Sequence, residues 1–379
     1  MLTYPLAGSI ESQFSILTPS PLQRVEAEWT AFSTSQEGSK KPATRHQVQV
    51  WCKRDDLLHP LISGNKWRKL VKPLHDFTQA PPSHVLSFGG PYSNHLHALA
   101  YCCKQLNIKF TAIIRGAYLK EQDLNQTLKD LEQWNARLVF VDKQTYQQRT
   151  DRHYLSKLRE EHNADIIIPE GGSQPDALFG MQAMIEEINA ASSNQSFDAI
   201  LIPVGSGASM AGVVKSCHAE TASQIIGIGV LKGEGYLEDL VKQFLNNSNI
   251  SKSNISSSNK SANKSANKSA NKDTPYLPWH INHNFHFGGY AKSSAELDAF
   301  CKDFNQQQAN LANSKSRQRV SQQEESKQDT PICIEPVYSG KCFFALKTLI
   351  QQAYFPPNSK ILLIHTGGLQ GARQQCHTG

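Results

Sequence analysis

Short runs of apolar residues alternate with segments of helical periodicity along most of the chain. The runs predict eight β-strands, at 84–88, 110–114, 137–141, 165–168, 199–204, 225–230, 332–336 and 361–365. Between the first two strands, Leu96, Leu99, Ala100 and Cys103 recur at the spacing of one helical face. Strands separated by helices need crossover connections, which favour parallel sheets with helices on both faces. The pattern therefore predicts an α/β fold.

Two polar segments interrupt this pattern. Residues 246–275 contain three copies of the sequence SANK, and residues 304–330 are rich in Gln, Ser, Asn and charged side chains. Neither segment carries enough apolar surface to offset the conformational entropy that ordering would cost. We expect both to be mobile surface insertions that carry no chemistry.

Length and charge narrow the classes of function. The 379 residues suffice for about two domains, and no apolar run reaches the roughly 18 residues of a membrane span. The N-terminus lacks a signal-peptide pattern, so we expect a cytoplasmic protein. Five units of the formal charge of +6 come from an acid-free tract at 246–272, which leaves +1 for the rest of the chain. The lysines of this tract are Lys252, Lys260, Lys264, Lys268 and Lys272. This distribution argues against a nucleic-acid-binding face and leaves polyanion binding by the tract as a minor alternative.

The cysteines give no sign of a metal site, because no two of the eight form a C-x-x-C pair. We interpret all of them as buried free thiols and expect no bound metal. They are Cys52, Cys102, Cys103, Cys217, Cys301, Cys333, Cys342 and Cys376.

Polar, mostly glycine-containing turns lie where predicted strands and helices meet, and the first contains a candidate nucleophile. Lys66 follows Ser63, Gly64 and Asn65, directly before a helical pattern. The positive end of a helix disfavours an ammonium there, and burial would add to this, so the amine would become more nucleophilic. The alternative is a solvated basic helix face, since further basic residues follow Lys66.

Two further turns could bind anions. Residues 89–95, GGPYSNH, offer Ser93 as a helix N-cap and exposed amides that could hold a carboxylate. Residues 205–209, GSGAS, are small enough for their amides to converge on a phosphate at a helix start. This second turn lacks the Lys of a Walker loop and the third glycine of a dinucleotide fingerprint.

The last turns are Glu335 to Lys341, EPVYSGK, and His365 to Leu369, HTGGL, both after predicted strands. They could place hydroxyl groups over a shared cleft, whereas we interpret His365 itself as a core histidine. A lysine, a phosphate-binding turn and several hydroxyl groups are together what pyridoxal phosphate requires.

The motifs KRDDLLHPLISGNKWRKL, FGGPYSNH, PEGGS, GSGAS, EPVYSGK and IHTGG occur in the order typical of one enzyme family. The chain resembles the D-cysteine desulfhydrase / 1-aminocyclopropane-1-carboxylate deaminase family from about residue 50 to 371. This resemblance implies a pyridoxal-phosphate-dependent enzyme of the tryptophan synthase β-like fold (fold type II), with the cofactor between two parallel-sheet α/β domains.

The resemblance also assigns roles. Lys66 would form the Schiff base, Asn94 would contact the phenolic oxygen of the ring, and Thr366 would meet the pyridine nitrogen. Ser93, Tyr290 and Tyr338 would join Lys66 in catalysis. The other cofactor-binding residues would be Asn65, Gly205, Ser206, Gly207, Ala208 and Ser209. The substrate would be bound by Tyr92, Ser93, Asn94 and His95.

A small amino acid is the expected substrate, and D-cysteine, converted to pyruvate, sulfide and ammonia, is favoured. A hydroxyl group at the pyridine nitrogen makes a milder electron sink, which suits elimination. The deaminase branch of the family carries Glu where this chain has Ser339, and it lacks Thr366. Tyr92 replaces the usual Gln beside the carboxylate site. The alternatives are 1-aminocyclopropane-1-carboxylate deamination, which yields 2-oxobutanoate, and a pyridoxal-phosphate-binding protein without turnover.

The resemblance also predicts the domain organisation. Residues 1–73 and 190–379 would form a larger cofactor domain that carries the two polar insertions. Residues 74–189 would form a smaller domain that closes over the substrate and excludes water. By the same resemblance we expect a homodimer.

Overall fold

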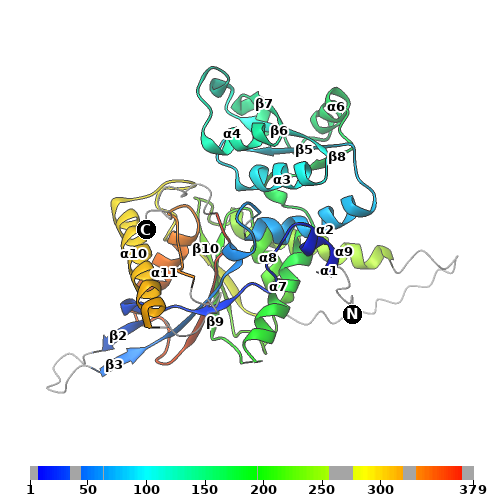
Figure 1. The fold of residues 1–379 in the computed structure, drawn as a ribbon. Helices are drawn as coiled ribbons and strands as arrows, with labels where there is room; N and C mark the ends of the chain where they lie inside the picture. The colour runs from blue at the N-terminus through cyan, green and yellow to red at the C-terminus, as the bar shows by residue number, and fades with distance from the viewer. Residues whose placement is uncertain are drawn as a thin grey trace, which may run out of the picture.

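The computed structural model describes residues 7–34, 44–62, 64–193, 195–255, 276–318 and 330–368. Two separate sheets organise the chain (Figure 1). The six-stranded sheet has the order β1 (Leu22–Arg24), β4 (Gln49–Lys53), β12 (Lys360–Ile364), β9 (Ala199–Val204), β10 (Ile225–Gly229) and β11 (Trp279–Asn282). The four-stranded sheet has the order β7 (Arg137–Val141), β6 (Lys109–Arg115), β5 (His84–Gly89) and β8 (Ile166–Ile168). All neighbouring strands within these sheets are parallel except β1, which is antiparallel to β4. β2 (Ala31–Thr34) and β3 (Thr44–Gln47) form an antiparallel pair.

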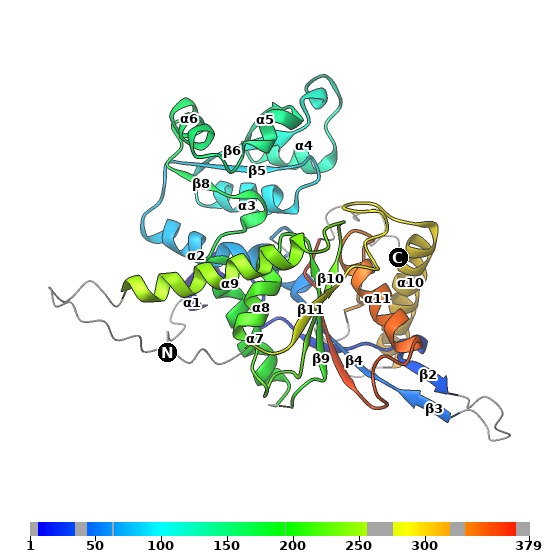
Figure 2. The same ribbon diagram turned by 180° about the vertical axis from the view of Figure 1, so that it is seen from behind.

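Helices cover both faces of each sheet. They are α1 (Ala7–Gln13), α2 (Asn65–Gln79), α3 (Asn94–Gln105), α4 (Gln126–Gln133), α5 (Lys143–Gln147), α6 (Arg152–His162), α7 (Ala177–Ala191), α8 (Ala208–Ser216), α9 (Tyr236–Ile255), α10 (Ala295–Gln318) and α11 (Ser339–Gln351). In the larger lobe, α10 and α11 pack on one face of the sheet and α7, α8 and α9 on the other (Figure 2). In the smaller lobe, α2, α3 and α4 pack on one face, with α5 and α6 behind.

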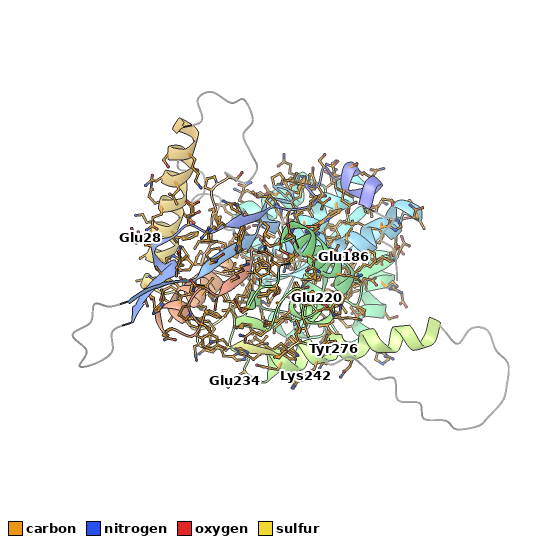
Figure 3. The ribbon with its side chains drawn as sticks, turned by 90° about the horizontal axis from the view of Figure 1, so that it is seen from below. Glu28, Glu186, Glu220, Glu234, Lys242 and Tyr276 are labelled. Atoms are coloured by element: carbon orange, nitrogen blue, oxygen red, sulfur yellow. The ribbon has the colours of Figure 1, made fainter. Side chains whose placement is uncertain are left out.

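The core consists of the inward faces of these layers, because removing apolar side chains from water drives the packing. Every residue of β9 is buried, as expected of a parallel strand covered on both sides. Charged side chains such as Glu28, Glu186 and Glu220 remain exposed at the periphery (Figure 3). The α/β expectation is confirmed.

Seven of the eight predicted strands are present, and the prediction for 332–336 is wrong. This segment forms no ladder, because side chains occupy its backbone hydrogen-bonding groups. Asn305 accepts a hydrogen bond from the Ile334 amide at 2.8 Å and donates one to its carbonyl at 3.0 Å. The Cys333 carbonyl accepts one from His365 Nε2 at 2.7 Å.

The insertion predictions also need correction where the structure describes them. Residues 304–318 belong to α10, and residues 246–255 belong to α9. In α10, Phe304 and Gln308 are buried, one helical turn apart, and Gln308 donates a hydrogen bond to the Glu26 carbonyl at 2.9 Å. Tertiary packing therefore outweighs the polar composition. Residues 256–275 and 319–329 lie outside the described part.

The cysteine interpretation holds for six residues, which are buried and free: Cys52, Cys102, Cys103, Cys217, Cys301 and Cys342. It is wrong for Cys333, which is disulfide-bonded.

Within the described ranges, no helix combines the length and the apolar character that crossing a bilayer requires.

Candidate functional site

Lys66 lies in the first turn of α2, and glycine geometry fixes where that helix begins. Gly64 adopts a left-handed φ of +59° and donates its amide to the Asp55 carbonyl at 2.9 Å. The next amide, of Asn65, donates to the Thr366 carbonyl at 3.0 Å. A Cβ at Gly64 would lie 1.8 Å from that same oxygen. Only glycine therefore lets the helix start against the segment that follows β12. Ser63 lies outside the described residues.

The small-residue turn 205–209 lies beside this lysine. It follows β9 and leads into α8, with Gly207 in the left-handed region as the N-cap of that helix. Asn65 Nδ2 donates to Ser209 Oγ at 3.2 Å, so the helix that carries Lys66 is joined to the turn. The first turn of α8 is therefore next to the first turn of α2, and amides at helix starts can bind anions.

Lys69 also faces this turn, although the sequence analysis did not name it as a candidate site residue. It is 1% exposed. Its Nζ lies 3.1 Å from Ser206 Oγ, 3.3 Å from the Gly171 carbonyl and 3.4 Å from Ser173 Oγ. None of these partners is a carboxylate, so within the described residues a buried cation faces the turn without a counter-ion. The sequence does contain a sign of this position, because Lys69 follows Lys66 by three residues, and residues three apart share a helix face.

The amines of Lys66 and Lys69 are both weakened as bases. Burial lowers the pKa of Lys66 to about 8, against the opposing field of Glu170. Burial and then the charge of Lys66 lower the pKa of Lys69 well below its usual value. Two lysine amines and a helix N-terminus lie close together here, and an anion bound among them would favour the charged form of both amines.

The polar residues at the start of α3 differ in burial and in hydrogen bonding. Ser93 is the N-cap, and its Oγ accepts a hydrogen bond from the Leu96 amide at 3.2 Å. His95 is buried, with Nε2 2.8 Å from Ser87 Oγ. Because Ser87 Oγ donates to the Ile168 carbonyl, His95 must donate to Ser87. Burial lowers the pKa of His95 well below its usual value, so the ring is neutral. Tyr92 is 66% exposed.

The two tyrosines singled out from the sequence lie close together near the turn 205–209. The Tyr290 and Tyr338 rings meet edge to face, with centroids 6.0 Å apart. A Cβ at Gly205 would be 3.6 Å from the Tyr338 ring, and one at Gly368 would be 3.6 Å from that ring and 3.3 Å from Asn94 Nδ2. The structure thus brings together residues from four sequence motifs. Burial raises the pKa of Tyr338 well above its usual value, which keeps the hydroxyl group protonated.

Thr366 and His365 have different surroundings. Thr366 is buried and binds the start of α2 through its carbonyl. His365 is fully buried, with both ring nitrogens in hydrogen bonds to backbone groups, at Cys333 and Gly367. The interpretation of His365 as a core histidine is therefore confirmed.

Glu170, in the PEGGS turn, is a further acidic group near the lysine. Its carboxylate accepts hydrogen bonds from Tyr146 Oη at 2.7 Å and Arg149 Nε at 2.6 Å. Its field acts on the pKa of both Lys66 and Tyr338. No periodicity in the sequence indicates this group, because its partners lie on a different helix and turn.

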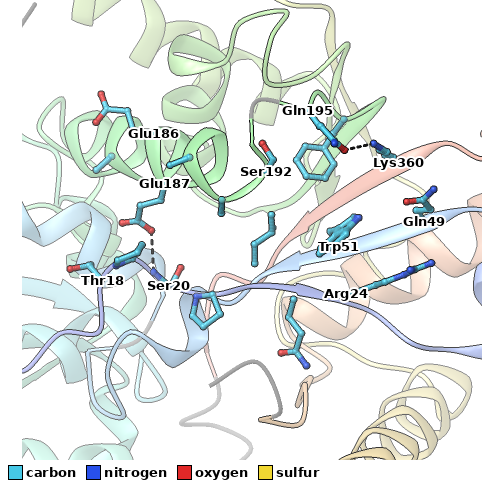
Figure 4. Close-up of a pocket in the computed structure, with 18 of the residues that line it drawn as sticks. Thr18, Ser20, Arg24, Gln49, Trp51, Glu186, Glu187, Ser192, Gln195 and Lys360 are labelled. Atoms are coloured by element: carbon cyan, nitrogen blue, oxygen red, sulfur yellow. Dashed lines mark hydrogen bonds between the residues drawn. The ribbon is translucent and has the colours of Figure 1, made fainter. Parts of the chain in front are cut away.

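A large cavity of about 1320 Å³ lies elsewhere, between α7 and the β1–β4 edge of the larger sheet (Figure 4). Trp51 and Glu187 line it, and none of the predicted site residues does. Among the described residues, no cluster of three or more His, Cys, Asp or Glu could hold a metal ion.

Comparisons with known proteins agree with this geometry. Residues 33–272 match the family described as pyridoxal-phosphate dependent enzymes. The Arabidopsis thaliana mitochondrial bifunctional D-cysteine desulfhydrase/1-aminocyclopropane-1-carboxylate deaminase is 25% identical over 87% of this chain and 75% of its own. The Yersinia pestis D-cysteine desulfhydrase is 22% identical over 84% of this chain and 86% of its own. A solved structure of an ACC deaminase homologue matches with a TM-score of 0.62 at 22% identity, covering 95% of both chains.

The family match spans more than half of the chain, and the solved structure shares its two-sheet architecture. Fold and family agree with a buried lysine that lies next to the start of a second helix, α8. This chain belongs to the pyridoxal-phosphate dependent enzyme family and has the fold type II architecture of that family.

Proposed function

We propose that this protein is a lyase that eliminates the β-substituent of a small amino acid, with D-cysteine as substrate and pyruvate, sulfide and ammonia as products. One observation carries the proposal. Lys66 lies three residues before a second buried lysine without a carboxylate partner, Lys69, whose Nζ is 3.1 Å from Ser206 Oγ in the turn 205–209.

The residues present fit pyridoxal phosphate. The phosphate dianion would supply the counter-charge that Lys69 lacks, and the amides of residues 205–209 would hold its oxygens. Lys66 would carry the covalent link, and Asn94 and Thr366 would contact the ring. When bound, the cofactor withdraws electrons from the substrate Cα.

The remaining residues bind the substrate and move protons. The amides and hydroxyl group at Ser93 would bind the substrate carboxylate. With a pKa of about 8, the Lys66 amine is basic enough to take the Cα proton and acidic enough to release it. Tyr338, whose pKa lies well above its usual value, stays a hydrogen-bond donor toward the leaving group.

The choice of D-cysteine rests on Ser339. This residue is 1% exposed, and its hydroxyl group is bonded to Glu335 at 3.0–3.2 Å, so position 339 supplies no carboxylate to the cleft. The deaminase branch has Glu at that position. The names of two relatives favour 1-aminocyclopropane-1-carboxylate as the second candidate substrate.

The covalent link tests the proposal directly. Borohydride treatment of the holoenzyme, followed by peptide mapping, should label Lys66, and Lys66→Ala should remove the label. The control Lys72→Ala, on an exposed part of the same helix, should keep it. A label on another side chain would refute the assignment.

Product assays then decide the substrate. Sulfide from D-cysteine supports the proposal, whereas 2-oxobutanoate from the cyclopropane substrate supports the second candidate. A bound cofactor with neither product, and no amino-acid-dependent spectral change, would mean cofactor binding without turnover.

We also propose that the smaller lobe closes over the substrate. The expected range 74–189 is shortened at its end, because α7 (Ala177–Ala191) packs on the larger sheet, so the closing domain ends before Ala177. The Ser173 hydroxyl group of the smaller lobe donates to Ser206 Oγ at 2.8 Å. Closure about this contact would bring residues 93–95 nearer to Lys66.

A further inference from the structure

Lys341, the last residue of the EPVYSGK motif, is a buried cation whose protons all go to backbone carbonyls. It lies in the first turn of α11 and is fully buried. Its Nζ donates to the carbonyls of Val230 at 3.0 Å, His286 at 2.9 Å and Gly289 at 2.9 Å. An ammonium group has three donors, so this set satisfies it completely.

Burying this ammonium group costs free energy of folding, so its position needs an explanation other than packing. Burial lowers the pKa of Lys341 to about 8, and the field of Glu335 opposes the shift only in part. Glu335 makes its own hydrogen bonds, to the amides of Val337, Tyr338 and Ser339 at the start of α11. No salt bridge to Lys341 is found among the described residues, and an uncompensated buried charge destabilises the fold.

Two of the three carbonyls that bind Lys341 belong to the segment that carries Tyr290. Val230 directly follows β10, whereas His286 and Gly289 lie in the turn 286–292. Gly288 and Gly289 have φ of +93° and +132° in this turn. The turn's own hydrogen bonds use the same two acceptors, because the Gly289 amide donates to the His286 carbonyl at 3.0 Å and the Lys292 amide to the Gly289 carbonyl at 3.2 Å.

The turn and the helix meet again at the tyrosine pair. Tyr290 is 47% exposed and contacts Tyr338, which is the N-cap of α11, three residues before Lys341. A half-exposed tyrosine on a glycine-rich turn has little packing of its own to hold it. Lys341 joins the turn to the helix that positions the other tyrosine.

We propose that Lys341 is a positioning residue, which fixes the turn 286–292 to β10 and α11 and so places Tyr290 opposite Tyr338 over the substrate. The effect of Lys341 on catalysis rests on the proposed function. The structural part of the proposal stands independently, because the turn is fixed whether or not substrate is present.

Amide hydrogen exchange of the cofactor-free full chain tests the structural part. In Lys341→Met, the peptide 286–292 should exchange at least tenfold faster, while β9 keeps its protection. The matched control is Lys53→Met, which removes another fully buried ammonium, bonded to Glu187 and the Ser20 carbonyl. That variant should leave 286–292 unchanged. Unchanged exchange in Lys341→Met, or equally faster exchange throughout the chain, would overturn the proposal.

Chemical rescue distinguishes hydrogen bonding from charge alone. In Lys341→Ala, added methylammonium should restore slow exchange at 286–292, because it can donate to the three carbonyls. Tetramethylammonium has the same charge but no N–H group, so it should have no effect. Equal rescue by both cations, or by neither, would contradict the assigned role.

Kinetics of the holoenzyme test the catalytic part. Lys341→Met should bind pyridoxal phosphate like the wild type and lower kcat/KM at least tenfold. Tyr290→Ala should do the same, and the double variant should lose no more than either single one, because both changes remove the same tyrosine from its place. Additive losses would show that Lys341 does not act through Tyr290 and would contradict the proposal. A wild type without turnover would refute the proposed function and leave the exchange result standing.

Discussion

Two lysines three residues apart on α2 are treated differently by the fold. Lys66 and Lys69 are both removed from water, and the charge of Lys66 raises the cost of charging Lys69. The result is one amine that is partly neutral near physiological pH and one that lacks a negative partner. Reactivity and anion binding thus come from the same physical cause.

The Lys66 pKa predicts the pH dependence of cofactor uptake. Only the neutral amine attacks an aldehyde, so the rate of pyridoxal phosphate incorporation into the cofactor-free protein should rise with pH and level off above a midpoint near 8. At pH 7 about one Lys66 amine in ten would be neutral.

Stopped-flow absorbance between pH 6.5 and 10 would measure this uptake rate. Glu170→Gln should move the midpoint to lower pH, because the field of Glu170 raises the Lys66 pKa. A rate that keeps rising tenfold per pH unit beyond pH 9.5 would indicate an ordinary lysine.

The start of α2 should be intolerant of a methyl group. Gly64→Ala would place Cβ 1.8 Å from the Thr366 carbonyl oxygen at a left-handed φ, so we expect a loss of about 2–5 kcal/mol of unfolding free energy. Gly90→Ala is the control, because a Cβ there meets nothing within 4 Å, and we expect a change of about 0.5 kcal/mol or less. Urea denaturation of both variants measures the difference, and equal stability would contradict the close approach.

At the scale of elements, α2 is fixed by a buried ionic network. Arg68 Nε and Nη2 donate to the Asp55 carboxylate, at 3.0 and 2.9 Å, and Nη1 and Nη2 donate to Glu187 of α7, at 2.7 and 2.8 Å. The neighbouring helices also approach closely, since a Cβ at Gly180 of α7 would lie 2.0 Å from the Arg68 carbonyl oxygen. The helix that presents Lys66 is therefore held on two sides.

Removing Arg68 should destabilise the protein strongly. Arg68→Met leaves Asp55 without its main partner in the interior, and breaking such a pair costs about 3–5 kcal/mol. On the same helix, Lys72→Met breaks an exposed pair with Asp76 and should cost about 0.5 kcal/mol or less. Thermal unfolding would show a fall in Tm for Arg68→Met alone, and similar falls in both variants would refute the network's role.

Across the whole molecule, the excess positive charge and the candidate site residues lie in different segments of the chain. The lysine-rich tract between α9 and β11 supplies most of the net positive charge, whereas the site residues lie on the cores of the two lobes. Replacing residues 256–272 with a Gly/Ser segment of equal length lowers the formal charge from +6 to +2.

This replacement should change kcat/KM less than twofold and weaken retention on a heparin column, because the tract adds charge but no site residue. Equal length keeps the loop-closure entropy similar. A tenfold loss of activity would show that the tract serves the site and would favour a polyanion-linked role.

Local signals predicted most of the fold and named the candidate site residues, and non-local contacts explain where the fold prediction failed. Residues 332–336 have the composition of a strand, but the side chains of Asn305 and His365 bind their backbone. Residues 304–318 have the composition of an insertion, but Phe304 and Gln308 pack as part of a helix. The sequence analysis missed β4 because its first and last residues, Gln49 and Lys53, are polar. Lys53 is nevertheless buried, and its ion-pair partner Glu187 lies on a helix that is distant in the sequence.

The sequence by itself determined the α/β class and the order of the strand-to-helix turns, and it singled out Lys66 and the turn 205–209 as candidates for holding the cofactor. These depend on periodicity, on small residues and on spacing, which act over a few residues. The tertiary structure alone decided that Lys69 faces the turn 205–209, that Glu170 acts on Lys66, and that Lys341 holds the turn of Tyr290. Each of those depends on burial and on partners from distant segments, because the charge state and the contacts of a side chain are set by the atoms that replace water around it.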